Sequence, residues 1–255
     1  GLLILDEEQR FGVKAKEKLK QIKNNEISGV IYFGKNIKSK EDLIKMNDYF
    51  LNLNKEKEHN FILELEQYAV DNNVPIVTKE GLELIKLLVK INNCKNILEI
   101  GTAIGYCSIN LALLDKEIHI DTIERKEAMY NKANENIKKI NLENQITTFI
   151  DDALEFDISK LNNKKYDLIF IDAAKAQYRR FFEKYMVLLN ENGIIVSDNL
   201  LFHGLVEQEI IDGKDLRALI RKIKNYNNWL FENEEFDTTF LRIGDGMAIS
   251  LKKKK

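Results

Sequence analysis

The sequence predicts an α/β domain with a mostly parallel seven-stranded sheet, helices on both faces and a C-terminal antiparallel hairpin. Three observations predict it: short apolar runs of strand type, helical stretches between them, and a turn signal near the end. The composition agrees, because 44% hydrophobic and 31% charged residues are ordinary for a soluble domain with a buried core. A chain of 255 residues suffices for one such domain with a small appendage.

Five short apolar runs, most of them bounded by turn residues, are the candidate parallel strands. They cover residues 96–100, 118–123, 146–150, 167–171 and 193–197. Between them, apolar residues recur at helical spacing, notably over residues 125–140 and 177–189. Strands that alternate with helices indicate βαβ units and a parallel sheet.

The two ends of the chain depart from this alternation. Residues 42–52, 61–70 and 82–91 have helical spacing, whereas residues 1–41 lack regular alternation. Residues 237–243 and 247–251 flank Gly244-Asp245-Gly246, which is a hairpin signal. We therefore predict an N-terminal extension over residues 1–41 and one catalytic domain over residues 42–255.

Charge and cysteine content limit the classes of partner and compartment. The formal net charge is −2, so an RNA partner would need a local basic face. Cys94 and Cys107 have no metal-ligand spacing, which favours a reduced, cytoplasmic setting. No apolar run reaches the length of a membrane span.

A glycine-containing turn follows the first parallel strand. Residues 96–100 end in a G-x-x-x-G pattern, Gly101 to Gly105, with Glu99 ahead of it and helical spacing behind it. Glycine is needed where a chain turns sharply and a ligand approaches the backbone closely. The dinucleotide pattern G-x-G-x-x-G is not met, which favours a ligand with an amino-acid head group over a pyrophosphate.

Acidic residues at the next two strand ends complete a nucleoside site. Glu124 lies about 20 positions past the glycines, where a carboxylate binds ribose hydroxyls. Asp152-Ala153 follows the third strand, where an acceptor can meet the adenine amino group, with Asp151 as the competing residue. Taken alone, Glu124 is equally an ordinary solvated residue at a strand end. Together, these features indicate S-adenosylmethionine.

Oxygen-bearing side chains follow the fourth and fifth strands. Asp172 ends one, and Asp198-Asn199 ends the other, so all three meet at one sheet edge. Carboxylate and amide oxygens suit Mg²⁺ or Mn²⁺, and such a cation would stabilise an acceptor oxyanion. Lys175 is placed to accept the proton or to stabilise the anion. The competing interpretation is that Asp172 caps a helix and Asp198-Asn199 forms a turn.

Residues 44–254 resemble the bacterial branch of the catechol-O-methyltransferase-like family, which has a Rossmann-like class I methyltransferase fold. Within it, the sequence is most similar to members that methylate wobble 5-hydroxyuridine in tRNA to 5-methoxyuridine. The matching segments are residues 74–77, 97–106, 166–175, 197–199 and 244–250.

The resemblance implies the site residues, the partners and the reaction. Beside the glycine turn at Gly101, the implied cofactor contacts are Val77, Cys107, Glu124, Asp152, Ala153 and Asp172. The implied metal ligands are Asp172, Asp198 and Asn199. Cys107 stands where relatives commonly carry Ser, which leaves a hydroxyl hydrogen bond there in doubt. The resemblance also implies a homodimer, with partner contacts before Val74, and a tRNA anticodon loop as partner.

Basic residues near the predicted site are candidates for RNA contacts. Arg217, Arg221 and Lys222, with Lys214 and Lys224, precede Tyr226 and Trp229, and Arg179 and Arg180 follow Lys175. Basic side chains bind phosphates, and an aromatic ring can stack an unpaired base. The alternative is a solvated helix face with Trp229 in the core.

The opening segment resembles fragments of other proteins. Residues 2–14 resemble the DEEQ helicase motif of transcription-repair coupling ATPases. Residues 29–36 only approach a phosphate loop, because Asn36 replaces the required Ser or Thr and the interior is strand-like. Residues 29–37 resemble part of a bacterial β-N-acetylhexosaminidase. We interpret residues 1–41 as non-catalytic.

Three functions are consistent with the sequence. The first is methylation of 5-hydroxyuridine in tRNA, and the second is methylation of a small catechol or phenylpropanoid by the same chemistry. The third is a non-enzymatic module that binds a cofactor or a nucleic acid.

Overall fold

The computed structural model describes residues 2–5, 29–32, 59–162, 164–208 and 210–253. The chain divides into two compact units, Gly1–His59 and Asn60–Lys255. The predicted boundary between residues 41 and 42, the predicted helix over residues 42–52 and residues 6–14 of the DEEQ-like segment lie outside the described residues.

The first unit contains a pair of short strands. Strands β1 (Leu2–Leu5) and β2 (Gly29–Tyr32) pair in parallel, with Leu2 opposite Gly29 and Leu5 opposite Tyr32. Residues 29–36 only approach the phosphate-loop pattern, and their interior was predicted to be strand-like. This prediction is confirmed over Gly29–Tyr32. A strand in this place lacks the turn that a phosphate loop requires.

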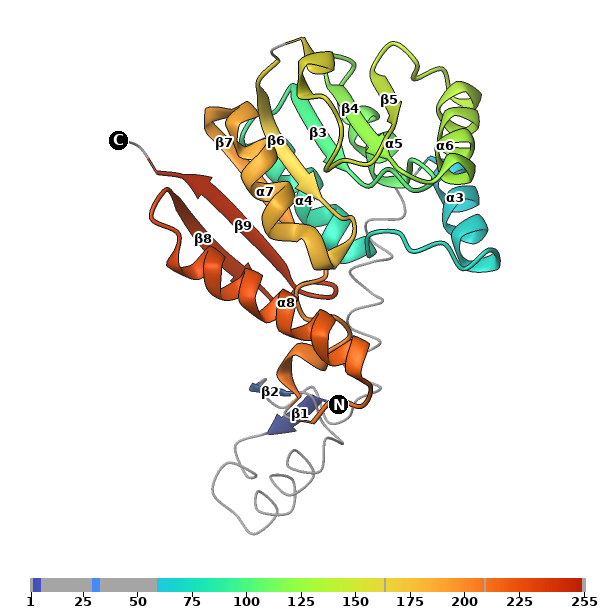
Figure 1. Cartoon of the computed structure of the whole chain (residues 1–255). Helices are drawn as coiled ribbons and strands as arrows, with labels where there is room; N and C mark the ends of the chain where they lie inside the picture. The colour runs from blue at the N-terminus through green and yellow to red at the C-terminus, as the bar shows by residue number, and fades with distance from the viewer. Residues whose placement is uncertain (1, 6–28, 33–58, 163, 209, 254–255) are drawn as a thin grey trace. The chain divides into compact units, whose positions relative to one another are not determined.

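The second unit is built on a seven-stranded sheet in the order β5-β4-β3-β6-β7-β9-β8 (Figure 1). Strands β3 to β7 are parallel, and β9 lies between β7 and β8, antiparallel to both. The predicted fold class is confirmed. The strands are β3 (Asn96–Ile100), β4 (His119–Glu124), β5 (Ile146–Ile150), β6 (Tyr166–Ile171), β7 (Leu189–Ser197), β8 (Phe236–Leu241) and β9 (Met247–Lys252).

The strand order places a crevice between β3 and β6. The chain builds outward from β3 through β4 to β5, and then crosses back to place β6 on the other side of β3. Open α/β sheets bind ligands at such a switch point, beyond the carboxyl ends of the strands. Ile100 pairs with Ile171 there, so the loops that follow these residues start side by side.

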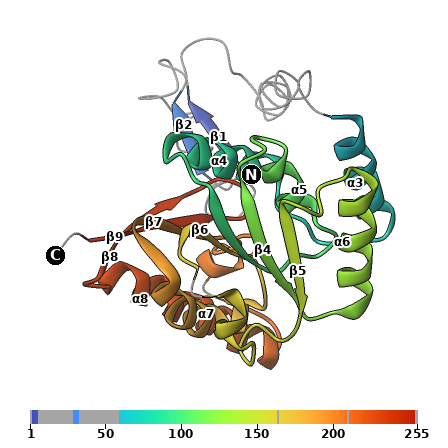
Figure 2. The same ribbon diagram turned by 90° about the horizontal axis from the view of Figure 1, so that it is seen from above.

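Helices cover both faces of the sheet (Figure 2). Ile97 and Phe170 belong to the core shared with α3, α4 and α5, whereas Leu98 and Ile169 belong to the core shared with α7 and α8. Successive strand residues therefore bury opposite faces, as a pleated strand requires. The helices are α3 (Asn60–Asp71), α4 (Lys79–Ile91), α5 (Tyr106–Ala112), α6 (Glu127–Lys139), α7 (Tyr178–Tyr185) and α8 (Lys214–Glu232).

Helix boundaries follow local chemistry more closely than hydrophobic spacing. Thr78 begins α4, because its side chain accepts a hydrogen bond from the Gly81 N–H at 3.2 Å. The helix predicted over residues 177–189 is shorter, since α7 ends at Tyr185 and a 3-10 turn, Met186–Leu188, leads into β7. That strand begins at Leu189, which pairs with Tyr166, instead of at residue 193. The polar residues 190–192 that follow Leu189 gave the sequence the pattern of a turn.

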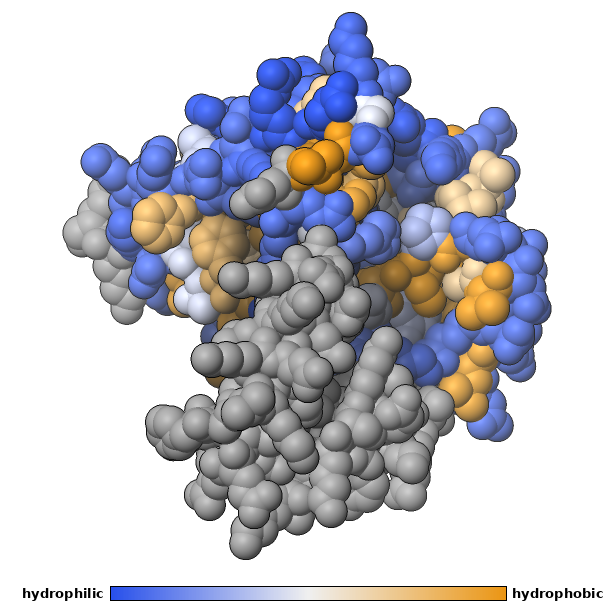
Figure 3. Space-filling view, turned by 90° about the horizontal axis from the view of Figure 1, so that it is seen from below, coloured by the Kyte–Doolittle hydropathy of each residue, from blue (hydrophilic) through white to orange (hydrophobic). Residues whose placement is uncertain are grey.

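The described surface is mainly hydrophilic on the face shown in Figure 3, with separate hydrophobic areas. Among the described residues, no helix has both the length and the apolar composition needed to cross a bilayer.

Candidate active site

A cavity of about 330 Å³ opens beyond the carboxyl ends of β3, β4, β5 and β6. Most of the predicted site residues line it, from both sides of the switch point. Among the predicted cofactor and metal residues, Asp198 is the exception, because it is 3% exposed and does not line the cavity. The predicted residues in the wall are Val77, Gly101, Cys107, Glu124, Asp152, Ala153, Asp172, Lys175 and Asn199.

Gly101 joins the two sides of the cavity. Its φ is +106°, and a Cβ added there would lie 2.1 Å from the backbone oxygen of Asp172. The neighbouring backbones are also bonded, since the Asp172 N–H donates to the Ile100 oxygen at 3.0 Å. Glycine is therefore required here for its conformation and for the close approach of two strands.

Glu124 is oriented by backbone donors. Its Oε2 accepts from the Ala103 N–H at 2.9 Å, and its Oε1 accepts from the Lys126 N–H at 2.8 Å. A carboxylate has about four acceptor sites, so two sites remain for a diol. The residue is 9% exposed and lines the cavity, as a ribose-binding carboxylate would.

The loop after β5 is held from two directions. Asp152 Oδ1 accepts from the Leu154 N–H at 2.9 Å, and the Tyr185 hydroxyl donates to the Ala153 oxygen at 2.6 Å. Lys184 Nζ donates to the oxygen of Leu154 at 2.6 Å. Both Asp151 and Asp152 line the cavity, so the two candidates for the adenine contact remain. Sequence spacing showed Tyr185 only as an apolar helix position and gave no sign of its hydroxyl contact.

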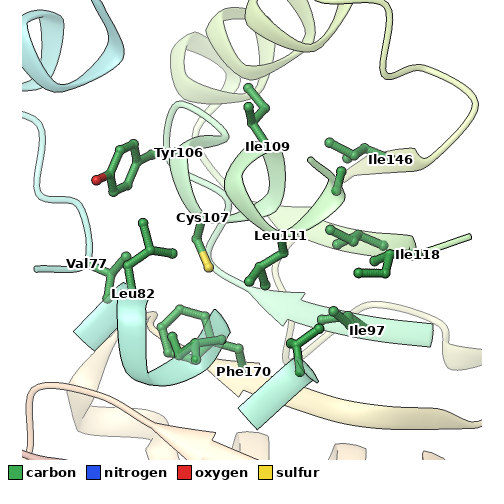
Figure 4. Close-up of a cluster of buried hydrophobic side chains, with 14 of the residues drawn as sticks. Val77, Leu82, Ile97, Tyr106, Cys107, Ile109, Leu111, Ile118, Ile146 and Phe170 are labelled. Carbon is green, nitrogen blue, oxygen red and sulfur yellow. The ribbon is translucent and has the colours of Figure 1, made fainter. Parts of the chain in front are cut away.

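Cys107 and Val77 form an apolar part of the wall. Cys107 is 5% exposed and Val77 is 4% exposed, and Figure 4 shows both with Leu82 in the same cluster. Burial, followed by the charge of Glu99, raises the pKa of the Cys107 thiol well above its usual range. The thiol is therefore neutral, and this part of the wall offers a ligand an apolar surface.

Glu99 is a buried carboxylate in the wall that the sequence analysis gave no role. Ser108 donates a hydrogen bond to Glu99 Oε2, and the Thr122 hydroxyl donates to the same oxygen at 2.7 Å. Burial raises the pKa of Glu99 to about 7, against the opposing effect of these hydroxyl donors. The sequence signal that could have placed Glu99 in the wall was its position two residues before Gly101.

The predicted metal residues meet at the ends of β6 and β7. Asn199 Nδ2 donates to Asp172 Oδ1 at 3.0 Å, and Asp198 Oδ1 accepts from the Asn199 N–H at 2.6 Å. The bond to Asp172 uses the amide N–H₂ of Asn199. The amide oxygen of Asn199, which is the atom that would bind a cation, does not take part in this bond. Asn199 has a φ of +61°, a conformation that Asn tolerates better than most residues.

The charges of these residues fit a divalent cation. Burial raises the pKa of Asp172, and burial followed by the charge of Asp172 raises the pKa of Asp198 to about 7. A bound cation would remove this repulsion. Within the described residues, no group of three or more His, Cys, Asp or Glu side chains is placed to hold a metal. The third oxygen ligand would therefore be the amide of Asn199.

Lys175 lies between the cavity and the loop after β7. It begins a short 3-10 turn, Lys175–Gln177, and its Nζ lies 6.0 Å from the centre of the Phe202 ring. Its charge opposes the rise in the pKa of Asp172. Phe202, which the sequence analysis did not single out, has a φ of +45°.

The basic residues proposed for RNA lie on α7 and α8, outside the cavity wall. Arg179, Arg180, Arg217, Arg221 and Lys222 are all exposed. Arg179 pairs with Glu183 at 2.8 Å and lies 5.1 Å from the centre of the Trp229 ring. Tyr226 is 2% exposed, so the possibility that it stacks an unpaired base is wrong. Trp229 is half-buried and packs against Phe182.

Comparisons with known proteins agree with this site. Residues 52–253 match the model of the O-methyltransferase family. Tapetum-specific methyltransferase 1 from Arabidopsis thaliana is 31% identical over 202 residues, 76% of this chain and 86% of that protein. A solved Staphylococcus aureus structure, described as a caffeoyl-CoA O-methyltransferase, is 43% identical with a TM-score of 0.77, covering 81% and 98%. A Bacillus cereus O-methyltransferase in complex with SAH is 26% identical with a TM-score of 0.66, covering 77% and 92%.

The matched region contains every part of the cavity described above. The glycine turn, Glu124 and the cluster of Asp172, Asp198 and Asn199 all lie between residues 52 and 253. Because the family model matches more than half of the sequence, the chain belongs to the O-methyltransferase family.

Proposed function

We propose that this protein transfers the methyl group of S-adenosylmethionine to a hydroxyl oxygen, with a divalent cation at Asp172, Asp198 and Asn199. The observation that carries the proposal is the position of two mutually repelling carboxylates beside the cavity that contains Gly101 and Glu124. The SAH-bound Bacillus cereus relative supports the cofactor. The carboxylate and amide oxygens support Mg²⁺ or Mn²⁺.

Residues at one end of the cavity bind the cofactor, and residues at the other end activate the acceptor. Glu124 binds the ribose, and the backbone at Gly101 admits the cofactor next to β6. In the reaction, a carbon–oxygen bond forms as the carbon–sulfur bond of the sulfonium breaks, and the acceptor hydroxyl gives up its proton. A cation bound by Asp172, Asp198 and Asn199 would stabilise the resulting oxyanion. Lys175 receives the proton or stabilises the same oxyanion, and a test that separates these roles is given below.

The acceptor that best fits this arrangement carries two neighbouring oxygens. One oxygen takes the methyl group, and the other completes the binding to the same cation. Small catechol-type phenols have such a pair, and the caffeoyl group named for the Staphylococcus aureus relative is one of them. A small catechol or phenylpropanoid is therefore the first acceptor class.

A second acceptor class is 5-hydroxyuridine at the wobble position of tRNA. Its 5-hydroxyl lies next to the 4-carbonyl, so it presents the same pair of oxygens. The specific observation in favour is the row of exposed basic side chains on α8, Arg217, Arg221 and Lys224, which lie at helical spacing on one face. An anticodon-loop partner, a homodimer and a cytoplasmic location remain predictions.

Purified protein with labelled S-adenosylmethionine tests the proposal directly. Catechol, caffeoyl-CoA and tRNA that carries 5-hydroxyuridine should be offered in competition, with and without EDTA. Label on any of them that EDTA abolishes supports metal-assisted transfer, and the labelled compound identifies the acceptor class. Cofactor binding without label on any acceptor would support the non-enzymatic module instead.

A further inference from the structure

Two neighbouring residues of α7 hold the turn that follows β5. The Tyr185 hydroxyl donates to the backbone oxygen of Ala153 at 2.6 Å. Lys184 Nζ donates to the oxygen of Leu154 at 2.6 Å and to that of Phe156 at 2.7 Å. Three backbone oxygens of one turn therefore accept from two adjacent side chains, which lie 28 to 32 residues further along the chain.

The turn that is held in this way carries Asp152, one of the two candidates for the adenine contact. Asp152 Oδ1 accepts from the Leu154 N–H at 2.9 Å, and Lys184 binds the oxygen of the same leucine. The backbone oxygen of Asp152 accepts from the Phe156 N–H at 2.8 Å, and Lys184 binds the oxygen of that phenylalanine as well. Lys184 is therefore linked to Asp152 twice, each time through one intervening residue.

The turn lines the cavity, whereas the two side chains that hold it do not. Asp152 and Ala153 belong to the cavity wall, and Lys184 and Tyr185 lie outside it. The Tyr185 side chain is fully buried. A ligand in the cavity would touch the turn but neither of these two side chains. Any effect of Lys184 or Tyr185 on a ligand must therefore pass through the turn.

Asp151, the other candidate, is held by different contacts. Its backbone N–H donates to the Glu124 oxygen at 3.0 Å, and its Oδ2 lies 3.5 Å from Nζ of Lys160. Neither contact involves α7. A change at Lys184 should therefore disturb Asp152 more than Asp151.

We propose that Lys184 and Tyr185 are positioning residues, which hold the turn after β5 so that Asp152 accepts a hydrogen bond from the 6-amino group of adenine. The inference rests on the cofactor proposed above, S-adenosylmethionine. A hydrogen bond weakens steeply when donor and acceptor are misaligned. Loosening the turn should therefore weaken recognition of the amino group more than binding of the ribose, which Glu124 provides from β4.

The test compares two ligands of the full chain by calorimetry: SAH, and its analogue in which a hydrogen replaces the 6-amino group of adenine. The ratio of their Kd values measures recognition of the amino group, because the ligands share every other group. Lys184→Met removes the two bonds of Nζ, and Tyr185→Phe removes only the hydroxyl. Lys184→Arg keeps a positive charge and N–H donors. If Tyr185→Phe does not fold, Lys184→Met carries the test, because Lys184 is only half-buried.

Two matched controls remove the same chemical groups away from the cavity. Tyr166→Phe removes another fully buried hydroxyl, which donates to Asp121 Oδ2 at 2.7 Å. Lys165→Met removes another lysine that binds a backbone oxygen, since its Nζ donates to the Val187 oxygen at 2.5 Å. Neither Tyr166 nor Lys165 lines the cavity. Thermal melting shows that each variant is folded and compares the losses of stability.

We expect the wild-type protein to bind SAH about 10-fold more tightly than the analogue, which corresponds to about 1.4 kcal/mol. Lys184→Met and Tyr185→Phe should reduce this preference to about 3-fold or less, whereas Lys184→Arg and both controls should keep it. An unchanged preference in Lys184→Met, or an equal loss in Tyr166→Phe, would overturn the inference. Equal binding of both ligands by the wild-type protein would overturn it too. A wild-type protein that does not bind SAH would overturn the proposed cofactor as well, so the two failures are distinguishable.

Discussion

The two ends of the cavity are prepared for their ligands in different ways. At the cofactor end, backbone N–H groups hold Glu124 and Asp152 in place. At the acceptor end, Asp172 and Asp198 repel each other, and the loop after β7 has positive φ at Asn199, Phe202, His203 and Gly204. The cofactor end is therefore organised by the fold itself, whereas the acceptor end has an electrostatic arrangement that a cation would complete.

The sharpest test of this contrast removes Asp198, one of the proposed metal ligands. Asp198→Ala should lower kcat by about 10³-fold, because a catalytic cation supplies several kcal/mol of transition-state stabilisation. Cofactor affinity, measured by calorimetry, should stay within about 3-fold of wild type, because Asp198 lies outside the cavity wall. A large loss of cofactor affinity in a folded variant would show that the two ends are not separate.

Glu99 gives a pH test of the cofactor end. Its folded-state pKa of about 7 lies above the ordinary value of 4.5, so this carboxyl favours the folded state at low pH. That contribution to stability is lost as the pH rises from about 4.5 to about 7. Glu99→Gln should remove this dependence, which amounts to about 3 kcal/mol. Urea unfolding at pH 5 and pH 8 measures it. Asp198 contributes in the same pH range, because its pKa is also raised to about 7, so the effect of Glu99 is the difference between wild type and Glu99→Gln. Added Mg²⁺ should not change that difference between the two proteins, and a difference that Mg²⁺ abolishes would contradict the assignment to Glu99.

Lys175 variants separate two roles at the acceptor end. Lys175→Met should lower kcat by about 10²-fold in either role. Lys175→Arg keeps the charge but cannot accept a proton, so it should restore most of kcat if Lys175 stabilises the oxyanion and none if it receives the proton. Steady-state kinetics with saturating Mg²⁺ measures both variants. Full activity in Lys175→Met would exclude both roles.

A change at Glu124 should weaken cofactor binding and leave metal binding intact, whereas a change at Asp198 should do the reverse. Glu124→Gln removes a charged acceptor of ribose hydroxyls and should raise the cofactor Kd by about 10-fold, from roughly 1.5 kcal/mol for a charge-assisted bond. Mn²⁺ affinity should be unchanged. Weaker Mn²⁺ binding in this variant would mean that the cofactor end shapes the metal site.

The smallest expected effect concerns the surface beyond the acceptor end. If tRNA is the acceptor, Arg217→Glu with Arg221→Glu should weaken tRNA binding and reduce its salt dependence by about one unit of slope per lost phosphate contact. Filter binding at several salt concentrations measures this. A double variant with the wild-type salt slope would exclude this face of α8 as a tRNA-binding surface. As a control, the same variant should methylate a catechol as well as wild type does.

The cofactor end was the easier part to predict from the sequence. The glycine turn follows β3 directly and Glu124 is the last residue of β4, so short apolar runs locate them. At the acceptor end, Asp172 follows β6 directly and was located in the same way. Asp198 and Asn199 were found for the same reason. The contact of Tyr185 joins distant segments, and a sequence pattern does not show which backbone oxygen its hydroxyl meets. Tyr226 was considered for base stacking because it follows basic residues, but it is buried.

The sheet beside the metal residues is completed by a late part of the chain. Ser197 pairs with Ala248 of β9, and β9 separates β7 from β8. During synthesis, β3 to β6 emerge early enough to form the cofactor end, while the edge of β7 stays unpaired until β9 has left the ribosome. We therefore expect a nascent chain halted before residue 247 to protect the glycine turn from proteases while the segment around Asp198 is still cleaved.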